Sequence, residues 1–561
     1  MLRAYDVRHV FGVPGDTSMP LYEAFYQARN VIQHIMVRDE RSASFMADVY
    51  ARVSGRPGVC EAPSGAGATY LVPGLAEANG SSIPVIALTT DIPLSNEGRN
   101  VLTELDQQAL FRPVTKWCVA VKRADKVPEI IRKGFRIATT GRCGAVQITL
   151  PHDVLEGDAG PAAIYAEPAC RTYPAYRSRP DPEAVAEAAR LLLAARRPVI
   201  VAGGGAVIAR AWKEVTALAE LLTAPVGTSI NGLGSIAATH PLSLGVVGGN
   251  GARSYANQVV AEADLVLFVG CKTDSVTTNN WTLPRADGSV TIIHVDVDPA
   301  EIGNNYPTAV GLVGDAKLAL ADLLDALKAQ VGDARQPNRQ RLAEIGALAE
   351  EWWTAQAEKM RSSARPIKPQ RVMHVLRQVL PPETVVVADA GTGTPFTSAF
   401  YPTPAGRQVI IPRAYGGLGY ALPGVVGAKL ARPESPVIGL MGDGSFGMAA
   451  GEMETIARLG LPVTLLQFNN GTFGWIKTLQ HLFYDDHYFS VDFEAETDHA
   501  AIARGFGLRG VRVDDPADLE PALREALHSD QATFIDVITE PEVTELPPVD
   551  KWLRAAGLEA R

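Results

Sequence analysis

The segment Val437–Trp475 constrains the fold of this chain more than any other segment. It opens with the apolar run Val437–Met441, breaks at Gly442–Ser445, and continues with a helical pattern over Met448–Leu459. A second apolar run then ends in an Asn-Asn-Gly-Thr turn. This order predicts a βαβ unit, in which two parallel strands are joined by a helix. The carboxyl ends of both strands then lie at the same edge of the sheet, where open α/β sheets bind their ligands.

Oxygen-bearing groups gather where these two strands end. Asp443 supplies a carboxylate, Asn470 supplies an amide oxygen, and the loop supplies a backbone carbonyl. Such ligands suit Mg²⁺, which completes its coordination shell with water and phosphate. Gly442 and Gly444 allow backbone N–H groups to approach a phosphate, and the following helix points its positive end towards it. The segment therefore predicts a site for Mg²⁺ and a phosphorylated cofactor.

Composition and charge argue against several classes of protein. The 561 residues are 47% hydrophobic and 20% charged, which is ordinary for a globular chain with large cores. A net charge of −10 argues against electrostatic binding of nucleic acid. No apolar run reaches about 18 residues, so we expect no membrane span. Five scattered cysteines without a CxxC spacing are typical of a reducing cytoplasm, where we expect the protein to reside.

Short apolar runs alternate with helical segments along the whole chain. This alternation predicts an α/β protein with three doubly wound parallel-sheet domains. We place them at residues 1–160, 181–330 and 365–548, followed by a C-terminal tail at 549–561. A connector rich in proline and alanine separates the first two domains, and a polar helical linker separates the last two. The first residues enter a helical pattern at once, so we expect the natural start to lie further upstream.

Three segments resemble one enzyme family. The GDGS…NNGT segment resembles the diphosphate-binding motif of thiamine diphosphate enzymes. The segment VRDERSASFMADVYARVSGRPGVCEAPSGAGATY is similar to the pyrimidine-binding domain of acetolactate synthase-like enzymes. RAYGGLGYALP, at Arg413–Pro423, resembles the cofactor loop of benzoylformate decarboxylase and acetolactate synthase. The resemblance implies the domain order pyrimidine-binding, middle Rossmann-like and diphosphate-binding, with thiamine diphosphate and Mg²⁺ as cofactors.

The resemblance also assigns roles to individual residues. Glu40 falls on the catalytic glutamate that exchanges a proton with the pyrimidine, and an apolar pocket would raise its pKa. Leu418 takes the place of the apolar residue beneath the bent cofactor, and Gln107 matches a glutamine that faces substrate. Asp443, Asn470 and the Thr472 carbonyl would hold Mg²⁺. The further contacts with the cofactor fall on Ser64, Gly391, Thr392, Gly393, Gly416, Gly442, Gly444, Ser445 and Thr472.

A less specific set of positions falls on the substrate pocket. These are Asp16, Thr17, Lys116, Trp475 and Leu479. They differ from the residues of acetolactate synthases, and Trp475 would narrow the pocket for the second substrate.

Without the motif, Glu40 would be interpreted as a surface residue paired with Arg38 or Arg41. Asp443 and Asn470 would likewise be interpreted as caps of strand ends. These interpretations treat the three residues as structural.

The leading interpretation of function is a decarboxylase and carboligase of the acetolactate synthase type, which joins pyruvate to a second carbonyl compound. The alternatives within the class are an aryl or branched 2-oxo-acid decarboxylase resembling benzoylformate decarboxylase and a 2-hydroxyacyl-CoA lyase. Outside it, Gly203–Gly205 after a strand would suit a dinucleotide-dependent oxidoreductase. A catalytically silent regulatory homologue is a further alternative.

The family resemblance leaves the middle domain and the assembly partly open. In acetolactate synthases this domain holds FAD, but Gly270–Asp274 departs from their Gly-x-Arg-Phe-Asp pattern, so FAD, ADP and an empty domain are all retained. The resemblance implies a homodimer or homotetramer with active sites between subunits. It does not decide whether a regulatory subunit is needed.

Overall fold

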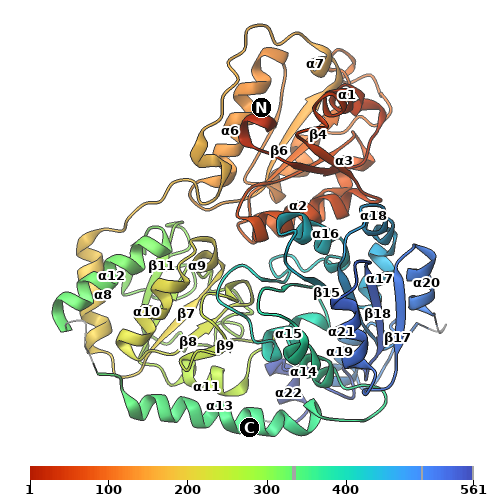
Figure 1. Cartoon of the computed structure of the whole chain (residues 1–561). Helices are drawn as coiled ribbons and strands as arrows, with labels where there is room; N and C mark the ends of the chain where they lie inside the picture. Colours follow the sequence, from red (N-terminus) through yellow and green to blue (C-terminus); the bar gives the residue numbers. More distant parts are fainter. Residues whose placement is uncertain (332–335, 494–496, 559–561) are drawn as a thin grey trace.

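The computed structural model of the chain describes residues 1–331, 336–493 and 497–558 (Figure 1). These residues form an α/β protein with three six-stranded sheets, and the paired strands of all three run parallel. The predicted fold class is therefore confirmed. Each sheet falls within one of the three domains drawn from the sequence, whose boundaries stay a prediction.

The N-terminal domain has the strand order β2-β1-β3-β4-β6-β5. Its strands are β1 (His9–Gly12), β2 (Gln33–Met36), β3 (Gly58–Ala62), β4 (Val85–Asp91), β5 (Trp117–Ala120) and β6 (Val146–Pro151). Its helices are α1 (Met19–Ala28), α2 (Glu40–Ser54), α3 (Ala66–Tyr70), α4 (Val72–Gly80), α5 (Gln107–Phe111), α6 (Val127–Thr139) and α7 (His152–Glu156). Helix α2 begins after Asp39, whose side chain accepts the N–H of Arg41, and ends at Gly55 with φ of 74°. Both ends therefore follow ordinary capping chemistry.

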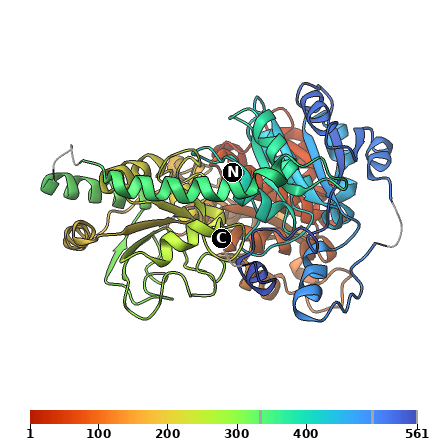
Figure 2. The same cartoon turned by 90° about the horizontal axis from the view of Figure 1, so that it is seen from below.

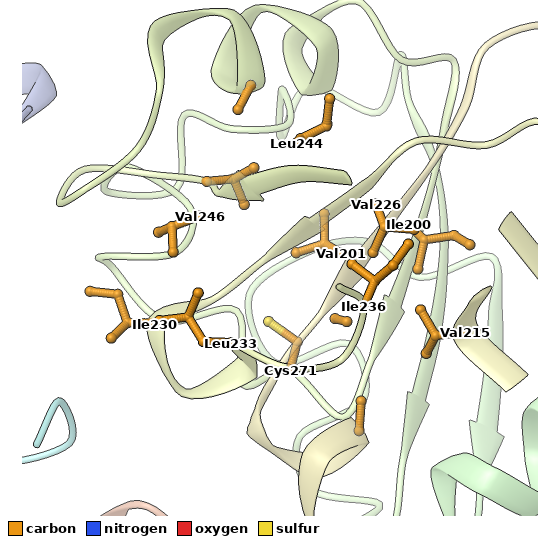
Figure 3. Packing of buried hydrophobic residues seen from close by; sticks show 14 of the residues in the cluster. Ile200, Val201, Val215, Val226, Ile230, Leu233, Ile236, Leu244, Val246 and Cys271 are labelled. Atoms are coloured by element: carbon orange, nitrogen blue, oxygen red, sulfur yellow. The ribbon is translucent and has the colours of Figure 1, made fainter. Parts of the chain in front are cut away.

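The middle domain has the strand order β12-β11-β10-β7-β8-β9. Its strands are β7 (Pro198–Ala202), β8 (Val226–Thr228), β9 (Ser243–Val246), β10 (Leu265–Val269), β11 (Thr291–Asp296) and β12 (Val310–Val313). Its helices are α8 (Pro182–Ala194), α9 (Gly204–Ile208), α10 (Trp212–Leu222), α11 (Ser254–Ala261) and α12 (Ala316–Val331). Figure 3 shows how Ile200, Val201 and Val226 of neighbouring strands pack against Val215 and Ile236. Strands buried on both faces explain why these apolar runs are nearly continuous in the sequence.

The C-terminal domain has the strand order β14-β13-β15-β16-β18-β17. Its strands are β13 (Val385–Ala388), β14 (Val409–Ile410), β15 (Val437–Gly442), β16 (Thr464–Asn469), β17 (Arg509–Val513) and β18 (Thr533–Ile538). Its helices are α14 (Pro369–Val379), α15 (Gly393–Phe400), α16 (Ala421–Ala431), α17 (Asp443–Ala449), α18 (Met453–Arg458), α19 (Gly474–Phe483), α20 (His499–Gly505) and α21 (Leu519–Leu527), followed by α22 (Asp550–Ala555) in the tail.

The connection between β15 and β16 differs in detail from the predicted single helix. Helix α17 begins at Asp443, five residues before the predicted start, and a 3₁₀ turn at Ala450–Glu452 separates it from α18. Gly442 is the residue before the helix, and the Asp443 side chain accepts the N–H of Gly444 in the first turn. The carboxylate predicted to bind Mg²⁺ therefore belongs to the first residue of a helix.

Two helical contacts join the domains. Helix α2 lies along α16, and a Cβ at Gly427 would come within 2.3 Å of the Met46 carbonyl oxygen, so the two backbones approach closely (Figure 1). Helix α13 (Arg339–Met360) runs across the middle and C-terminal domains (Figure 2). None of the helices in the described ranges is long and apolar enough to span a lipid bilayer.

Candidate active site

Asp443 and Asn470 lie side by side at the carboxyl edge of the C-terminal sheet, as predicted. Strands β15 and β16 pair directly. One carboxylate oxygen of Asp443 accepts the N–H groups of Asn470 at 3.0 Å and Gly471 at 2.7 Å, and the other accepts Gly444 N–H at 2.8 Å. Burial raises the pKa of Asp443 to about 6, against the effect of these hydrogen bonds. A bound divalent cation would favour the ionised carboxylate.

The side chain of Asn470 is oriented by a carboxylate that the sequence did not single out. Its amide nitrogen donates to Glu542 at 2.8 Å, which leaves its carbonyl oxygen as the acceptor on the other side. The buried Glu542 also accepts the hydroxyl of Thr392. Burial raises the pKa of Glu542. Because Glu542 follows β18, far along the chain from Asn470, its only sequence signal was a polar residue after a strand.

A cavity of about 340 Å³ opens beside Asp443. It is lined by most of the cofactor-binding residues predicted for this domain: Gly391, Thr392, Gly416, Leu418, Gly442, Gly444, Ser445 and Thr472. Trp475 lines the same cavity, and Asn470 lines an adjoining one together with Asp443 and Gly444. Gly393 begins α15 next to this turn. Residues from four separate loops thus meet at one edge of the sheet.

This set of groups fits Mg²⁺ and a diphosphate. Asp443 is only 5% exposed, and the three N–H groups that it accepts hold its carboxylate in one orientation. Gly442 and Gly444 carry no side chain, and a Cβ at Gly444 would lie 2.6 Å from the Phe473 ring. The Gly444 N–H donates to Asp443, so a phosphate at the start of α17 would be left with the N–H groups of the residues that follow, from Ser445 on.

The loop that carries Leu418 is held at its end by a buried aspartate. Asp389 follows β13 and accepts the N–H groups of Tyr420 at 2.9 Å and Ala421 at 3.1 Å, at the start of α16. Burial raises the pKa of Asp389 to about 7. The Gly416 φ of 76° lets the chain turn into the cavity. The sequence pointed to the loop but not to Asp389.

Glu40 is the first residue of α2 and is 9% exposed. The ion pair at this helix start joins Arg41 to Asp39 at 2.7 Å rather than to Glu40, which removes the surface-pair interpretation. Burial raises the pKa of Glu40, and the nearby carboxylates of Asp39 and Glu61 raise it further. Gly67 lies against it, because a Cβ there would come within 2.9 Å of the Glu40 Oε1 atom.

The other N-terminal candidates fall into two groups. Ser64 and Thr17 are joined by a hydrogen bond of 3.1 Å between their hydroxyls, and Asp16 precedes Thr17 at the same loop. Gln107 instead uses its amide within the sheet, accepting the Thr89 hydroxyl at 2.5 Å and donating to the Thr90 carbonyl at 2.9 Å. Their proposed contacts with substrate stay predictions.

Lys116 and Leu479 do not line the cavity at Asp443. The Lys116 ammonium donates to the carbonyls of Ile137 at 2.6 Å and Thr140 at 2.7 Å. Leu479 lies about one turn beyond Trp475 on α19. Trp475 itself packs against Trp552 of α22, with ring centroids 4.3 Å apart, so the C-terminal tail supports this wall of the cavity.

The glycine-rich strand end of the middle domain forms a separate cavity of about 110 Å³. Gly203 and Gly205 pack against the backbone at Gly270, where a Cβ on Gly203 would lie 2.2 Å from the Gly270 carbonyl oxygen. The cavity also contains Lys272, which donates to the Gly80 carbonyl, and Asp296, whose pKa burial raises to about 6. Close packing against the Gly270 backbone therefore explains why glycine occupies positions 203 and 205.

The two halves of the predicted active site do not meet within the chain. The described residues that line the cavity at Asp443 come from the C-terminal domain and from Asn250 of the middle domain. No residue of the N-terminal domain is among them, so Glu40 does not reach this cavity.

Three family models match the chain. They describe the thiamine pyrophosphate enzyme N-terminal TPP binding domain at residues 1–110, the central domain at 185–323 and the C-terminal TPP binding domain at 389–537. The probable acetolactate synthase large subunit of Methanocaldococcus jannaschii is 36% identical over 550 residues, covering 96% of this chain and 90% of that protein. The acetolactate synthase isozyme 3 large subunit of Escherichia coli is 32% identical over 538 residues, covering 95% and 92%. The chain therefore belongs to the thiamine pyrophosphate enzyme family, with similarity that extends through all three domains.

Proposed function

We propose that this chain is a thiamine diphosphate- and Mg²⁺-dependent carboligase of the acetolactate synthase type. It would decarboxylate a 2-oxo acid such as pyruvate and join the remaining unit to a second carbonyl compound. The cavity beside Asp443 carries this proposal, because it gathers eight predicted cofactor-binding residues from four loops. The likeness to acetolactate synthases over nearly the whole chain supports the same reaction class.

Different residues of the cavity would hold the metal ion, the diphosphate and the rings of the cofactor. Asp443, Asn470 and the Thr472 carbonyl would hold Mg²⁺. Glu542 accepts the amide N–H of Asn470, so the amide oxygen of Asn470 points away from Glu542. The N–H group of Ser445, in the first turn of α17, would donate to diphosphate, and Gly444 and Thr392 would border it. Leu418 would present an apolar surface to the rings. When bound, thiamine diphosphate supplies the electron sink that allows a 2-oxo acid to lose CO₂.

Glu40 would hold and release the proton that the aminopyrimidine exchanges. Its raised pKa keeps the proton on the carboxyl to higher pH than in water, which suits a group that must both give and take it. Because Glu40 does not reach the cavity of its own chain, we propose that the partner's N-terminal domain completes each site. A homodimer is then the smallest active form, and a homotetramer would contain two such pairs.

Two features bear on the substrate. Among the described residues that line the cavity there is no histidine, so a ready proton donor for release of a simple aldehyde is missing from this wall. This favours carbon–carbon bond formation over the benzoylformate decarboxylase-like alternative. Trp475, held by Trp552, would restrict the acceptor to a small carbonyl compound.

FAD is a further cofactor that the middle domain would hold in its cavity at Gly204. Gly204 differs from the other two glycines, because a Cβ added there would meet the Asn231 side chain at 3.3 Å rather than the Gly270 backbone. Asp296 would face a ribose hydroxyl, as acidic residues at the end of such strands do. The visible absorption spectrum of the purified protein tests this assignment, since bound flavin absorbs near 450 nm and ADP does not.

The proposed function is tested by stripping the protein of cofactor and restoring it. Turnover of pyruvate should require both thiamine diphosphate and Mg²⁺, and product analysis with 2-oxo acid and aldehyde acceptors should show a new carbon–carbon bond. Equal turnover with and without thiamine diphosphate would overturn the proposal. Release of free aldehyde alone would favour the simple decarboxylase.

A further inference from the structure

Two polar side chains that line the cavity at Asp443 each have a buried atom without a hydrogen-bond partner among the described residues. Asn250 is 4% exposed, and its amide oxygen makes no hydrogen bond with any residue that the structure describes. The Nε of Arg413 is buried and equally unpaired. Burying polar groups without partners costs free energy, so natural proteins keep such groups where a ligand completes them. Neither side chain belongs to the predicted set of cofactor-binding residues.

Arg413 brings a positive charge that the chain itself does not neutralise. Burial lowers its pKa, while the carboxylates of Asp274 and Glu77 act in the opposite direction from a distance. Neither carboxylate forms an ion pair with the guanidinium, because each is already engaged. Asp274 accepts the N–H groups of Val276 and Thr277, and Glu77 is held by Arg52 at 3.0 Å. Among the described residues, the guanidinium of Arg413 therefore has no acceptor.

The backbone of Arg413 is fixed in place by Glu77. This buried carboxylate accepts the N–H groups of four successive residues, Arg413 to Gly416, at 3.2, 3.2, 2.8 and 3.2 Å. The side chain of Tyr415 is 63% exposed and contributes little anchoring. Backbone hydrogen bonds to Glu77 thus hold the loop in place, and they fix the position of the Arg413 backbone at the cavity wall.

The backbone of Asn250 is fixed in a similar way from the other side. Gly249 donates to the Val276 carbonyl at 2.7 Å, and Gly251 donates to the Pro548 carbonyl at 2.8 Å. In addition, the N–H of Asp550 in the C-terminal tail donates to the Gly249 carbonyl at 3.2 Å. The middle domain and the C-terminal tail therefore hold the amide rigidly against the same cavity.

We propose that Arg413 and Asn250 together form a subsite for the carboxylate of a 2-oxo acid substrate. A guanidinium offers two parallel N–H donors to a carboxylate, and the amide of Asn250, whose orientation is free to reverse, adds a third donor. The subsite selects an acceptor that carries a carboxylate over a neutral aldehyde. This inference rests on the proposed function, since it names the class of its second substrate.

Diphosphate is the other anion that this cavity would receive, and the position of the pair argues against it. The groups suited to diphosphate lie at the start of α17, on Gly442–Ser445. Arg413 lies before Leu418 on a different loop, and Asn250 belongs to another domain. The pair thus reaches the cavity from other segments than the groups suited to diphosphate.

The direct test is binding of oxamate, an unreactive analogue of pyruvate, to protein loaded with thiamine diphosphate and Mg²⁺. Calorimetry should show that Arg413→Gln weakens oxamate binding roughly tenfold to a hundredfold, because one charged bidentate contact is lost. Asn250→Asp should weaken it more than Asn250→Ala does, since it places a like charge against the carboxylate. Arg123→Gln, which removes an exposed arginine of the N-terminal domain, is the matched control and should leave binding unchanged.

Two further measurements separate the outcomes. The affinity for thiamine diphosphate should stay within about twofold of the wild type in Arg413→Gln; a large loss there with unchanged oxamate binding would overturn the proposal in favour of diphosphate. With active protein, the KM for a 2-oxo acid acceptor should rise in Arg413→Gln while that for acetaldehyde stays the same. Oxamate binding requires no turnover, so it distinguishes failure of the subsite from failure of the proposed reaction. Unchanged oxamate affinity in both Arg413→Gln and Asn250→Asp refutes the subsite.

Discussion

Asp443 and Glu40 occupy equivalent places in two different domains. Asp443 comes directly after β15 and Glu40 comes shortly after β2, and both strands belong to six-stranded parallel sheets. Each residue is the first of a helix, and burial raises the pKa of each carboxyl. Their surroundings differ. Asp443 accepts three backbone N–H groups and lines a cavity built by its own domain, whereas Glu40 does not reach that cavity. The half proposed to bind Mg²⁺ is assembled within one chain, whereas the half proposed to exchange the proton needs a second surface.

The largest effect is expected from removing the carboxylate of the half proposed to bind Mg²⁺. Asp443→Ala should abolish retention of Mg²⁺ and thiamine diphosphate and reduce turnover by roughly 10³-fold or more, because a metal ligand worth several kcal/mol is lost. Equilibrium dialysis with the cofactors would measure this. Retained cofactor in the variant would show that Asp443 has only a structural role at the start of α17.

A smaller loss is expected at Glu40, and only in catalysis. Glu40→Gln should lower turnover by about 10²- to 10⁴-fold, the usual contribution of a positioned proton-exchanging group. Thiamine diphosphate should still bind, because Glu40 lies outside the cavity proposed to hold diphosphate. Comparing turnover with cofactor affinity therefore separates the two halves. Equal losses in both quantities would contradict the division.

The assembly can be tested by mixing the two inactive variants. If each site takes Glu40 from one chain and Asp443 from its partner, a mixed dimer of Glu40→Gln and Asp443→Ala contains one site with both residues intact. Random exchange of subunits should then restore about a quarter of the wild-type activity, since half the dimers are mixed and each has one working site. Activity assays after exchange should show this gain, which would be missing if both groups acted within one chain.

Sequence reasoning succeeded where the site is local and failed where distant residues complete it. Asp443 and Asn470 lie in one βαβ unit, so parallel pairing of two neighbouring strands was enough to bring them together. Glu542 reaches Asn470 from beyond the last strand, and Asn250 reaches the cavity from another domain. No local pattern encodes such contacts.

A second limit of sequence reasoning concerns polar residues whose partners the sequence does not show. Gln107 and Lys116 looked available for substrate, yet their side chains bond to the backbone or side chains of their own domain. Arg413 was recognised only as part of a loop motif, although its side chain is the unpaired one. Availability of a side chain depends on tertiary packing, which periodicity and composition do not report.

The smallest expected effect is on the pH dependence of folding stability and comes from the buried carboxyl of Asp389 in the C-terminal domain. Its pKa is about 7 in the folded protein and 3.8 ordinarily, so the folded state keeps a proton that the unfolded state releases. Its contribution to stability is full below about pH 4 and declines as the pH rises through 7, by at most about 1.4 kcal/mol per pH unit. Asp389→Asn cannot ionise, so the difference in unfolding midpoint between wild type and variant should shrink from pH 5 to pH 8. Thermal unfolding of both proteins without cofactor measures this difference, and subtracting the two curves cancels the contribution of other buried carboxyls such as Asp443. Parallel curves would show that the Asp389 carboxyl is already ionised at pH 5, with its charge balanced by the N–H groups of Ala390, Tyr420 and Ala421.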